Sequence, residues 1–221
     1  MSRPPLHIAI LISGRGSNMA AIARACREGR LNARVDAVIS DRPGVAGLDT
    51  ARALGLDAGV VPWRGAAQRA AFEQALDAAL AAAKPEVIVL AGFMRILSPG
   101  FVASRAGRML NIHPSLLPKY AGLHTHRRVL EAGDREHGAS VHFVTAQLDG
   151  GPVVLQSRVA VLPGDSEQSL AARVQATEHI IYPRVIGWLA AGRLAWRQDR
   201  PWLDDRPLDE PVVEDFRAAR T

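Results

Sequence analysis

Residues 6–27, which read LHIAILISGRGSNMAAIARACR, decide the fold class of this chain. Leu6–Ile12 is a short, continuous apolar run, which is typical of a strand that is buried on both faces. Over Ser17–Arg27 the apolar side chains recur at helical spacing instead. A glycine-containing loop, 13–18, joins the two segments. A buried strand, a glycine loop and a helix in this order predict the first unit of an α/β sheet.

The same alternation continues through the first half of the chain. The further predicted strands are 35–39, 59–61, 87–91 and 109–112, and the predicted helices are 45–54, 66–83 and 98–106. Continuous apolar strands separated by helices favour a parallel sheet with helices on both faces. We therefore expect a doubly wound, Rossmann-like α/β fold with a mostly parallel sheet.

The pattern changes after residue 112. Runs 140–144 and 153–161 are predicted strands with no room for a helix between them, so they indicate a C-terminal antiparallel extension of the sheet. A long C-terminal helix is expected over 166–191. Beyond it, 194–196 and 201–203 form a candidate hairpin.

Length and composition fit one domain with a large core. Of the 221 residues, 48% are hydrophobic, and no linker or repeat divides them. We expect a single domain over 1–221, with a core at about 6–194 and a tail at about 195–221 whose last ten residues fray. No apolar run reaches the roughly 18 residues of a membrane span. The single cysteine, Cys26, excludes an internal disulfide and fits a reducing cytoplasm.

The net charge of +5 does not favour a nucleic-acid partner. The basic residues are almost all arginine, and they alternate with Asp and Glu along the chain without interleaved aromatic residues. Two accounts of this bias stay open. It reflects the base composition of the genome, or it provides a modest positive field that attracts small anionic substrates.

The loop Ser13-Gly-Arg-Gly-Ser-Asn18 is a candidate anion site. Glycines let the backbone approach a ligand, and the free N–H groups at the start of a helix favour negative charge. The loop lacks the third glycine of the dinucleotide fingerprint, although Asp41 would fit that fingerprint. The loop either only turns the chain or binds a ligand. If the loop binds a ligand, a phosphate monoester is favoured over a pyrophosphate, because Met19 would hinder close approach of the helix to the ligand.

Asn111 and His113 form a second candidate site. Alternate residues of an extended segment point to the same side, and Pro114 favours extended geometry at His113. With a carboxylate from Asp149, the amide and the imidazole suit acyl transfer, in which one binds an oxyanion and the other moves a proton. The alternatives are a turn-capping asparagine, a surface histidine and an aspartate that only begins a tight Asp-Gly turn.

A metal site is not expected. His124 and His126 are two residues apart, and residues at this spacing do not share a face of a helix. They are therefore poorly placed to bind a metal ion together with His113. No cysteine or close carboxylate cluster supplies further ligands.

Several motifs together resemble the folate-dependent formyltransferases. They are SGRGSN at 13–18, AGFMRIL at 91–97, NIHPSLLP at 111–118, YAGLHTH at 120–126, HGASVH at 137–142, LDGG at 148–151 and ATEHIIYP at 176–183. They occur in the family's order over roughly residues 6–194. Within the family, the chain looks like the members that formylate glycinamide ribonucleotide with 10-formyltetrahydrofolate in purine synthesis.

The resemblance implies a role for each matched residue in catalysis. Asn111 would hold the formyl oxygen as it becomes an oxyanion, and His113 would donate a proton in the same step. Asp149 would favour the protonated form of His113. The resemblance also implies a cis peptide at Leu117–Pro118.

The implied ribonucleotide site uses the glycine loop and the long helix. Gly16, Ser17 and Asn18 would bind the phosphate through backbone N–H groups and a hydroxyl, and Glu178 would accept hydrogen bonds from the ribose hydroxyls. Arg15 adds a cation beside the proposed phosphate. It either strengthens binding or faces solvent.

The implied folate site combines two strand ends. Its residues would be Arg69, Met94, Arg95, Ile96, Leu97, Asn111, Val144 and Asp149. Arg69 would meet the anionic tail of the folate, and Arg64 is its rival for that contact.

Three other functions compete with transfer to the ribonucleotide. A formyltetrahydrofolate deformylase would send water to the formyl carbon, and a methionyl-tRNA formyltransferase would need a second, basic domain after the core. A folate or nucleotide sensor would need no catalytic residues, yet Asn111, His113 and Asp149 are all present. We expect a cytoplasmic enzyme with small-molecule substrates, a monomer or homodimer, without nucleic-acid or membrane partners.

Overall fold

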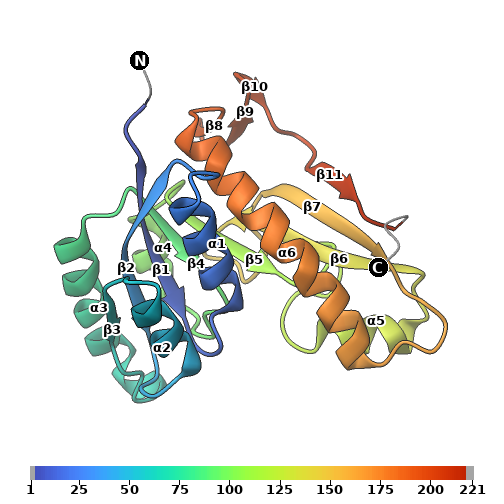
Figure 1. Ribbon diagram of the computed structural model, residues 1–221, viewed down its shortest axis with the longest axis horizontal. Helices are drawn as coiled ribbons and strands as arrows, with labels where there is room; N and C mark the ends of the chain where they lie inside the picture. Colours follow the sequence, from blue (N-terminus) through green and yellow to red (C-terminus); the bar gives the residue numbers. More distant parts are fainter. Residues whose placement is uncertain (1–2, 218–221) are drawn as a thin grey trace.

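The computed structural model describes residues 3–217 of the chain. Within this range the strands form one sheet of eight and another of three (Figure 1). The first half contributes β1 Leu6–Ile12, α1 Ser17–Arg27, β2 Ala33–Ser40, α2 Ala46–Ala53, β3 Ala58–Val60, a 3-10 turn Ala66–Gln68, α3 Arg69–Ala83, β4 Val87–Leu90, α4 Pro99–Ala103 and β5 Met109–His113.

Five of the eight strands of the large sheet lie side by side and run parallel to one another. Their order is β3-β2-β1-β4-β5, so the direction in which strands are added reverses between β1 and β4. This confirms the predicted doubly wound, mostly parallel sheet. Open α/β sheets bind ligands at such a reversal, outside the carboxyl ends of the strands.

β6 (Glu136–Phe143) and β7 (Val153–Ala160) extend the sheet beyond β5. β6 runs antiparallel to both neighbours, as predicted. One expectation for the tail was wrong. Within the last ten residues, β11 (Val212–Asp215) does not fray but pairs parallel with β7, because its backbone completes a ladder along that strand. Residues 218–221, which were also expected to fray, lie outside the described residues.

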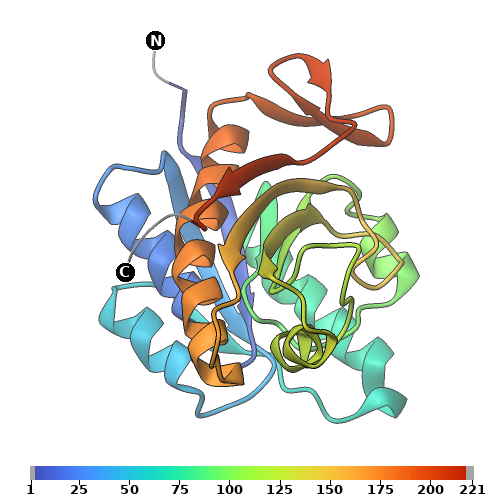
Figure 2. The same ribbon diagram turned by 90° about the vertical axis from the view of Figure 1, so that its right-hand side faces the viewer.

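Helices cover both faces of the parallel strands (Figures 1 and 2). Ile8, Ile10 and Ile12 of β1 face the core that contains α1 and α6 (Glu167–Ala190), whereas Ala9 and Leu11 face the core that contains α3. Both sides of β1 are therefore buried, which explains its continuous apolar run.

The long helix α6 is joined to the centre of the sheet by a buried tyrosine. The hydroxyl of Tyr182 lies 3.0 Å from the carbonyl oxygens of Leu90 and Leu110, one in β4 and one in β5. The helix begins after Ser166, whose hydroxyl accepts a hydrogen bond from the N–H of Ser169 at 3.1 Å. The tyrosine contacts hold the helix against one face of the sheet.

The tail packs against the body of the molecule. β8 (Leu194–Arg197), β9 (Arg200–Leu203) and β10 (Arg206–Pro207) form the small antiparallel sheet, which confirms the predicted hairpin. The centroids of the Trp196 and Phe143 rings lie 4.9 Å apart. A Cβ at Gly107 would lie only 2.2 Å from the Trp196 side chain, so this contact requires glycine.

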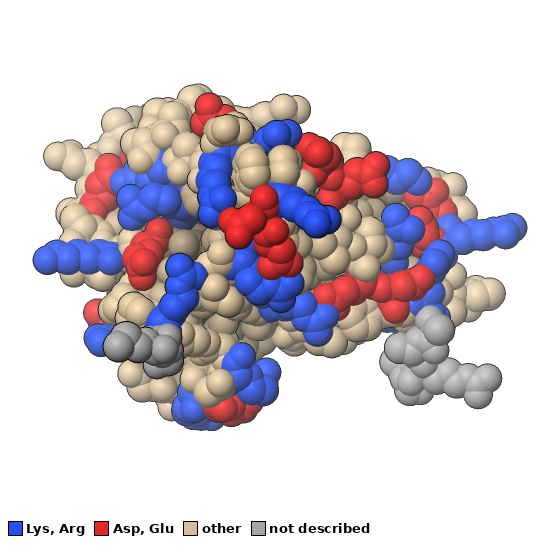
Figure 3. Space-filling view, turned by 90° about the horizontal axis from the view of Figure 1, so that it is seen from above, with Lys and Arg blue, Asp and Glu red and all other residues tan. Residues whose placement is uncertain are grey.

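Two further features complete the fold. α5 (Thr125–Ala132), a short helix, was not predicted, and the Leu117–Pro118 peptide is cis as expected. Over residues 3–217, no helix combines the length and apolar character needed to cross a membrane. On the face seen in Figure 3, arginines and lysines are interspersed with acidic side chains and do not form one continuous basic stretch.

Candidate active site

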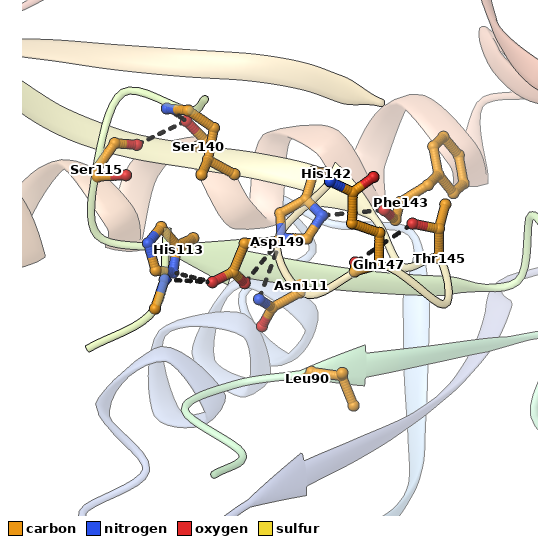
Figure 4. Close-up of polar contacts among 12 residues, drawn as sticks. Leu90, Asn111, His113, Ser115, Ser140, His142, Phe143, Thr145, Gln147 and Asp149 are labelled. Carbon is orange, nitrogen blue, oxygen red and sulfur yellow. Dashed lines mark hydrogen bonds and ion pairs between the residues drawn. The ribbon is translucent and has the colours of Figure 1, made fainter. Parts of the chain in front are cut away.

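The candidate site lies at the carboxyl ends of β1, β4 and β5. Asn111 and His113 project from β5, and Asp149 reaches them from the β6–β7 loop (Figure 4). A cavity of about 270 Å³ lies beside the glycine loop, and one of about 110 Å³ lies beside the loop after β4. The groups that the sequence singled out therefore meet at one edge of the sheet.

His113 and Asp149 form a buried pair. His113 Nδ1 lies 3.4 Å from Asp149 Oδ2, and 8% of each side chain is exposed. The other ring nitrogen, Nε2, lies 2.9 Å from the carbonyl oxygen of Tyr120. The backbone N–H of Gly122 donates to Asp149 Oδ2 at 2.9 Å and holds the carboxylate in place. Because both ring nitrogens face acceptors, the arrangement suits an imidazolium that donates from both.

His142 was missing from the predicted site. β6 places it directly opposite Asn111. His142 Nδ1 donates to the carbonyl oxygen of Phe143 at 2.9 Å, so Nε2 is left to accept from Asn111 Nδ2 at 3.2 Å. Burial lowers the pKa of His142, which favours the neutral ring that this bond needs. His142 thus orients the Asn111 amide and leaves its second N–H for a ligand.

The larger cavity contains the predicted phosphate loop. Gly16 has a φ of 70°, and a Cβ there would lie 3.0 Å from the Cα of Gly47, so the loop needs glycine at this position. Among the described residues, no side chain caps the N-terminus of α1, and its first turn holds no acid. Its free N–H groups can therefore bind an anion. Arg15 lines the same cavity.

Asn18 and Glu178 join α1 to α6 at this cavity. Asn18 Nδ2 donates to Glu178 Oε2 at 2.8 Å, and both side chains are buried. Burial raises the pKa of Glu178. The side chain of Asn18 is therefore bound to Glu178, and its backbone N–H is the group available to an anion.

Two polar side chains that line the larger cavity were not predicted. Gln175 lies one helical turn before Glu178, and its i, i+3 spacing on α6 was the available signal. His126 comes from α5, a helix that the sequence pattern did not reveal. Ser17 and Gly16 line the cavity as expected.

The smaller cavity gathers most of the predicted folate-binding residues. Its lining includes Arg95, Ile96, Leu97, Asn111, Val144 and Asp149. Met94 does not line it, and its side chain is 56% exposed. Neither Arg69, the first residue of α3, nor its rival Arg64, which precedes that helix, lines it.

The histidines near the site do not form a metal centre. Over residues 3–217, no group of three or more His, Cys, Asp or Glu side chains is placed to hold a metal ion. His126 Nδ1 instead lies 3.0 Å from His137 Nε2. Burial lowers the pKa of both rings, that of His137 to about 4.

Comparisons with known proteins agree with this geometry. Residues 6–186 match the family model described as formyl transferase. The chain is 52% identical to the phosphoribosylglycinamide formyltransferase of Escherichia coli (strain K12) over 92% of its length and 96% of the relative. It is 42% identical to the human trifunctional purine biosynthetic protein adenosine-3, over 84% of this chain and 18% of that protein. The solved phosphoribosylglycinamide formyltransferase of Coxiella burnetii superposes with a TM-score of 0.88, at 46% identity, over 95% of this chain and 99% of that one.

Proposed function

Because this chain belongs to the formyl transferase family, we propose that it transfers the formyl group of 10-formyltetrahydrofolate to the amine of 5′-phosphoribosylglycinamide. The products are the N-formyl ribonucleotide and tetrahydrofolate, and the reaction belongs to de novo purine (IMP) synthesis. The observation that carries the proposal is the buried His113–Asp149 pair beside Asn111, between a cavity suited to a phosphate and a second cavity.

The reaction begins when the neutral amine of the ribonucleotide attacks the formyl carbon. The carbonyl electrons move to the formyl oxygen, and the free N–H of Asn111 donates to that oxyanion. The positive charge of protonated His113 stabilises it electrostatically, while the two His113 N–H groups face Tyr120 and Asp149. The intermediate then collapses as the bond from carbon to the folate N10 breaks. Overall, one proton leaves the attacking nitrogen and one reaches N10. Asp149 orients the His113 ring during these steps.

The larger cavity is the ribonucleotide site in this proposal. The backbone N–H groups of Gly16, Ser17 and Asn18 bind the phosphate, together with the hydroxyl of Ser17. Glu178 accepts hydrogen bonds from the ribose hydroxyls. Its bond from Asn18 supports this role because it holds the carboxylate at the cavity wall.

The smaller cavity is the folate site. Residues 95–97, Asn111, Val144 and Asp149 surround the pteridine end, and the exposed Met94 lies beside it. The anionic tail extends beyond the cavity, where Arg69 or Arg64 meets it. This places the formyl group between the pteridine and the ribonucleotide, next to Asn111.

One assay tests the proposed function against its competitors. Purified protein is incubated with 10-formyltetrahydrofolate, with or without the ribonucleotide, and release of tetrahydrofolate is followed. Release that requires the ribonucleotide supports transfer. Equal release without it would indicate a deformylase, and no release in either case would indicate a sensor.

We also propose that residues 1–221 act as one domain in the cytoplasm. The packing of Trp196 on Phe143 supports the single domain, since the tail shares the core of the molecule. The free thiol of Cys26 is consistent with a reducing compartment. The partners in this proposal are the two small-molecule substrates.

A further inference from the structure

Asp41 occupies the position at which dinucleotide-binding proteins place an acid for the ribose, yet it is closed to any ligand. It follows β2 directly, and its side chain is 0% exposed. Its carboxylate accepts a hydrogen bond from Arg95 Nε instead. The exposed Arg42 lies further away, with its Nε 3.7 Å from the same oxygen. The Asp41 carboxylate therefore binds a side chain of the protein and not a ligand.

Arg95 belongs to the loop after β4, and its guanidinium is enclosed on two sides. Besides Asp41, it lies over the ring of Trp63, 5.5 Å from the centroid. Only 19% of the Arg95 side chain is exposed. A guanidinium with so little contact to water depends on its carboxylate partner, because an unpaired buried charge is costly.

The loop 93–97 alternates between anchored and free side chains. Phe93 stacks on Phe72, and Leu97 is buried. Met94 and Ile96 are 56% and 59% exposed. Between the anchors, the N–H of Met94 donates to Ser13 Oγ at 2.8 Å. The loop is thus held in place by several contacts, and all of its residues except Met94 line the smaller cavity.

We propose that Asp41 is a positioning residue for the folate site, which acts through Arg95 to hold the loop 93–97 in its binding shape. This inference rests on the proposed function, in which that loop receives the pteridine. Asp41 itself contacts neither substrate. Its loss should weaken folate binding and leave ribonucleotide binding intact, because residues of the loop 93–97 line the smaller cavity and none of them lines the larger one.

The test is Asp41→Asn, which keeps the shape of the side chain and removes its charge. Binding of tetrahydrofolate and of 5′-phosphoribosylglycinamide is measured in separate calorimetric titrations. We expect the Kd for tetrahydrofolate to rise at least about tenfold and the Kd for the ribonucleotide to stay within about twofold. In an Arg95→Met background, Asp41→Asn should change the folate Kd by less than about twofold, since its effect passes through Arg95.

Two controls separate this effect from general destabilisation. Asp36→Asn removes another nearly buried carboxylate from β2, which pairs with Arg34 at 2.9 Å and His7 at 2.8 Å away from the site. It should lower the melting temperature without changing either Kd. Arg42→Gln removes the exposed cation beside Asp41 and should also leave the folate Kd unchanged.

The outcomes are distinct. A folate Kd within twofold of the wild type for Asp41→Asn, or an equal loss of affinity for both ligands, overturns the inference. So does a further loss of affinity in the Arg95→Met background. A wild-type chain that binds tetrahydrofolate but transfers no formyl group would contradict the proposed function and leave the positioning role intact. A wild-type chain that binds no folate would overturn both.

Discussion

Asn111 has two amide N–H groups, and His142 accepts one of them, so a single donor remains for the substrate. Loss of one oxyanion donor typically lowers kcat by about 100- to 1000-fold, or about 2.7–4 kcal/mol of barrier. We expect a loss of at least this size for Asn111→Ala and for His113→Ala, measured as kcat/KM at saturating cosubstrate. Asn32→Ala, at an exposed position outside the site, serves as the control. Activity within about threefold of the wild type in either variant would remove that residue from its role.

Arg15 is the one cation of the glycine loop, and it lines the cavity proposed for the ribonucleotide. Two opposite charges 4 Å apart in water attract by about 1 kcal/mol, which corresponds to roughly fivefold in binding. Arg15→Gln should therefore raise the KM for the ribonucleotide by about fivefold at low salt and leave the KM for folate unchanged. Salt screens exposed charges, so the difference should vanish near 1 M salt. Arg27→Gln changes the last residue of α1, the helix that follows the loop, and should have no effect. A KM for Arg15→Gln equal to the wild type at low salt would show that Arg15 only faces solvent.

The sequence predicts side chains of the site where the local pattern determines their placement. Asn111 and His113 alternate along one strand, and the glycine loop follows the first strand, so neighbouring residues suffice to place them. His142 depends on which residue of β6 lies opposite Asn111, and that register is set by distant pairing. Asp149 was a candidate from the sequence, but an ordinary Asp-Gly turn explained it as well, and the resemblance decided its role beside His113.

At the scale of elements, a histidine pair joins α5 to β6. Burial lowers the pKa of His137 to about 4, whereas the unfolded chain titrates near 6.5. His126, on which His137 packs, shifts in the same direction. A histidine with a folded pKa below its unfolded pKa stabilises the fold above pH 6.5, and this contribution is lost as the pH falls from 6.5 to 4. The loss amounts to about 1.4 kcal/mol per pH unit for each proton taken up.

We therefore expect the free energy of unfolding to fall from pH 6.5 to 4 more steeply in the wild type than in His137→Gln. Urea denaturation at several pH values measures both curves. Acidic residues titrate over the same range in both proteins, so only the difference between the curves reports on the pair. Parallel curves would mean that the histidines stay neutral or titrate alike in both states.

Elements differ in how well their sequences indicate them. β1 is buried on both faces from Ile8 to Ile12, so these five residues are all apolar and the pattern is easily recognised. α5 has only eight residues, of which Thr125 and Val129 are buried, so its apolar face is too short to stand out in the sequence. β11 contains Val212 and Val213 followed by two acids, and it becomes a strand only because β7 offers a free edge. Tertiary context decides such short elements.

At the scale of the whole molecule, the tail covers the sheet edge that the core leaves open. β11 pairs with residues 155–158 of β7, and two ion pairs flank this ladder, Arg184 with Glu214 and Arg217 with Glu136. An uncovered edge strand presents free N–H and C=O groups that can pair with another chain. The described part of the tail therefore stabilises the fold and prevents the edge of β7 from pairing with another molecule.

A chain that ends at Leu208 tests this argument because it keeps the hairpin β8–β9 and removes β11. Each backbone hydrogen bond contributes about 1 kcal/mol, and each kcal/mol shifts the melting temperature of a domain of this size by roughly 2–4 °C. We expect the melting temperature to fall by about 5 °C or more and concentration-dependent association to appear in sedimentation experiments. A chain that ends at Arg217 retains β11 and should match the full-length protein in both measurements. If the shorter chain melts within about 1 °C of the longer one and stays equally dispersed, then β11 neither stabilises the sheet nor protects its edge.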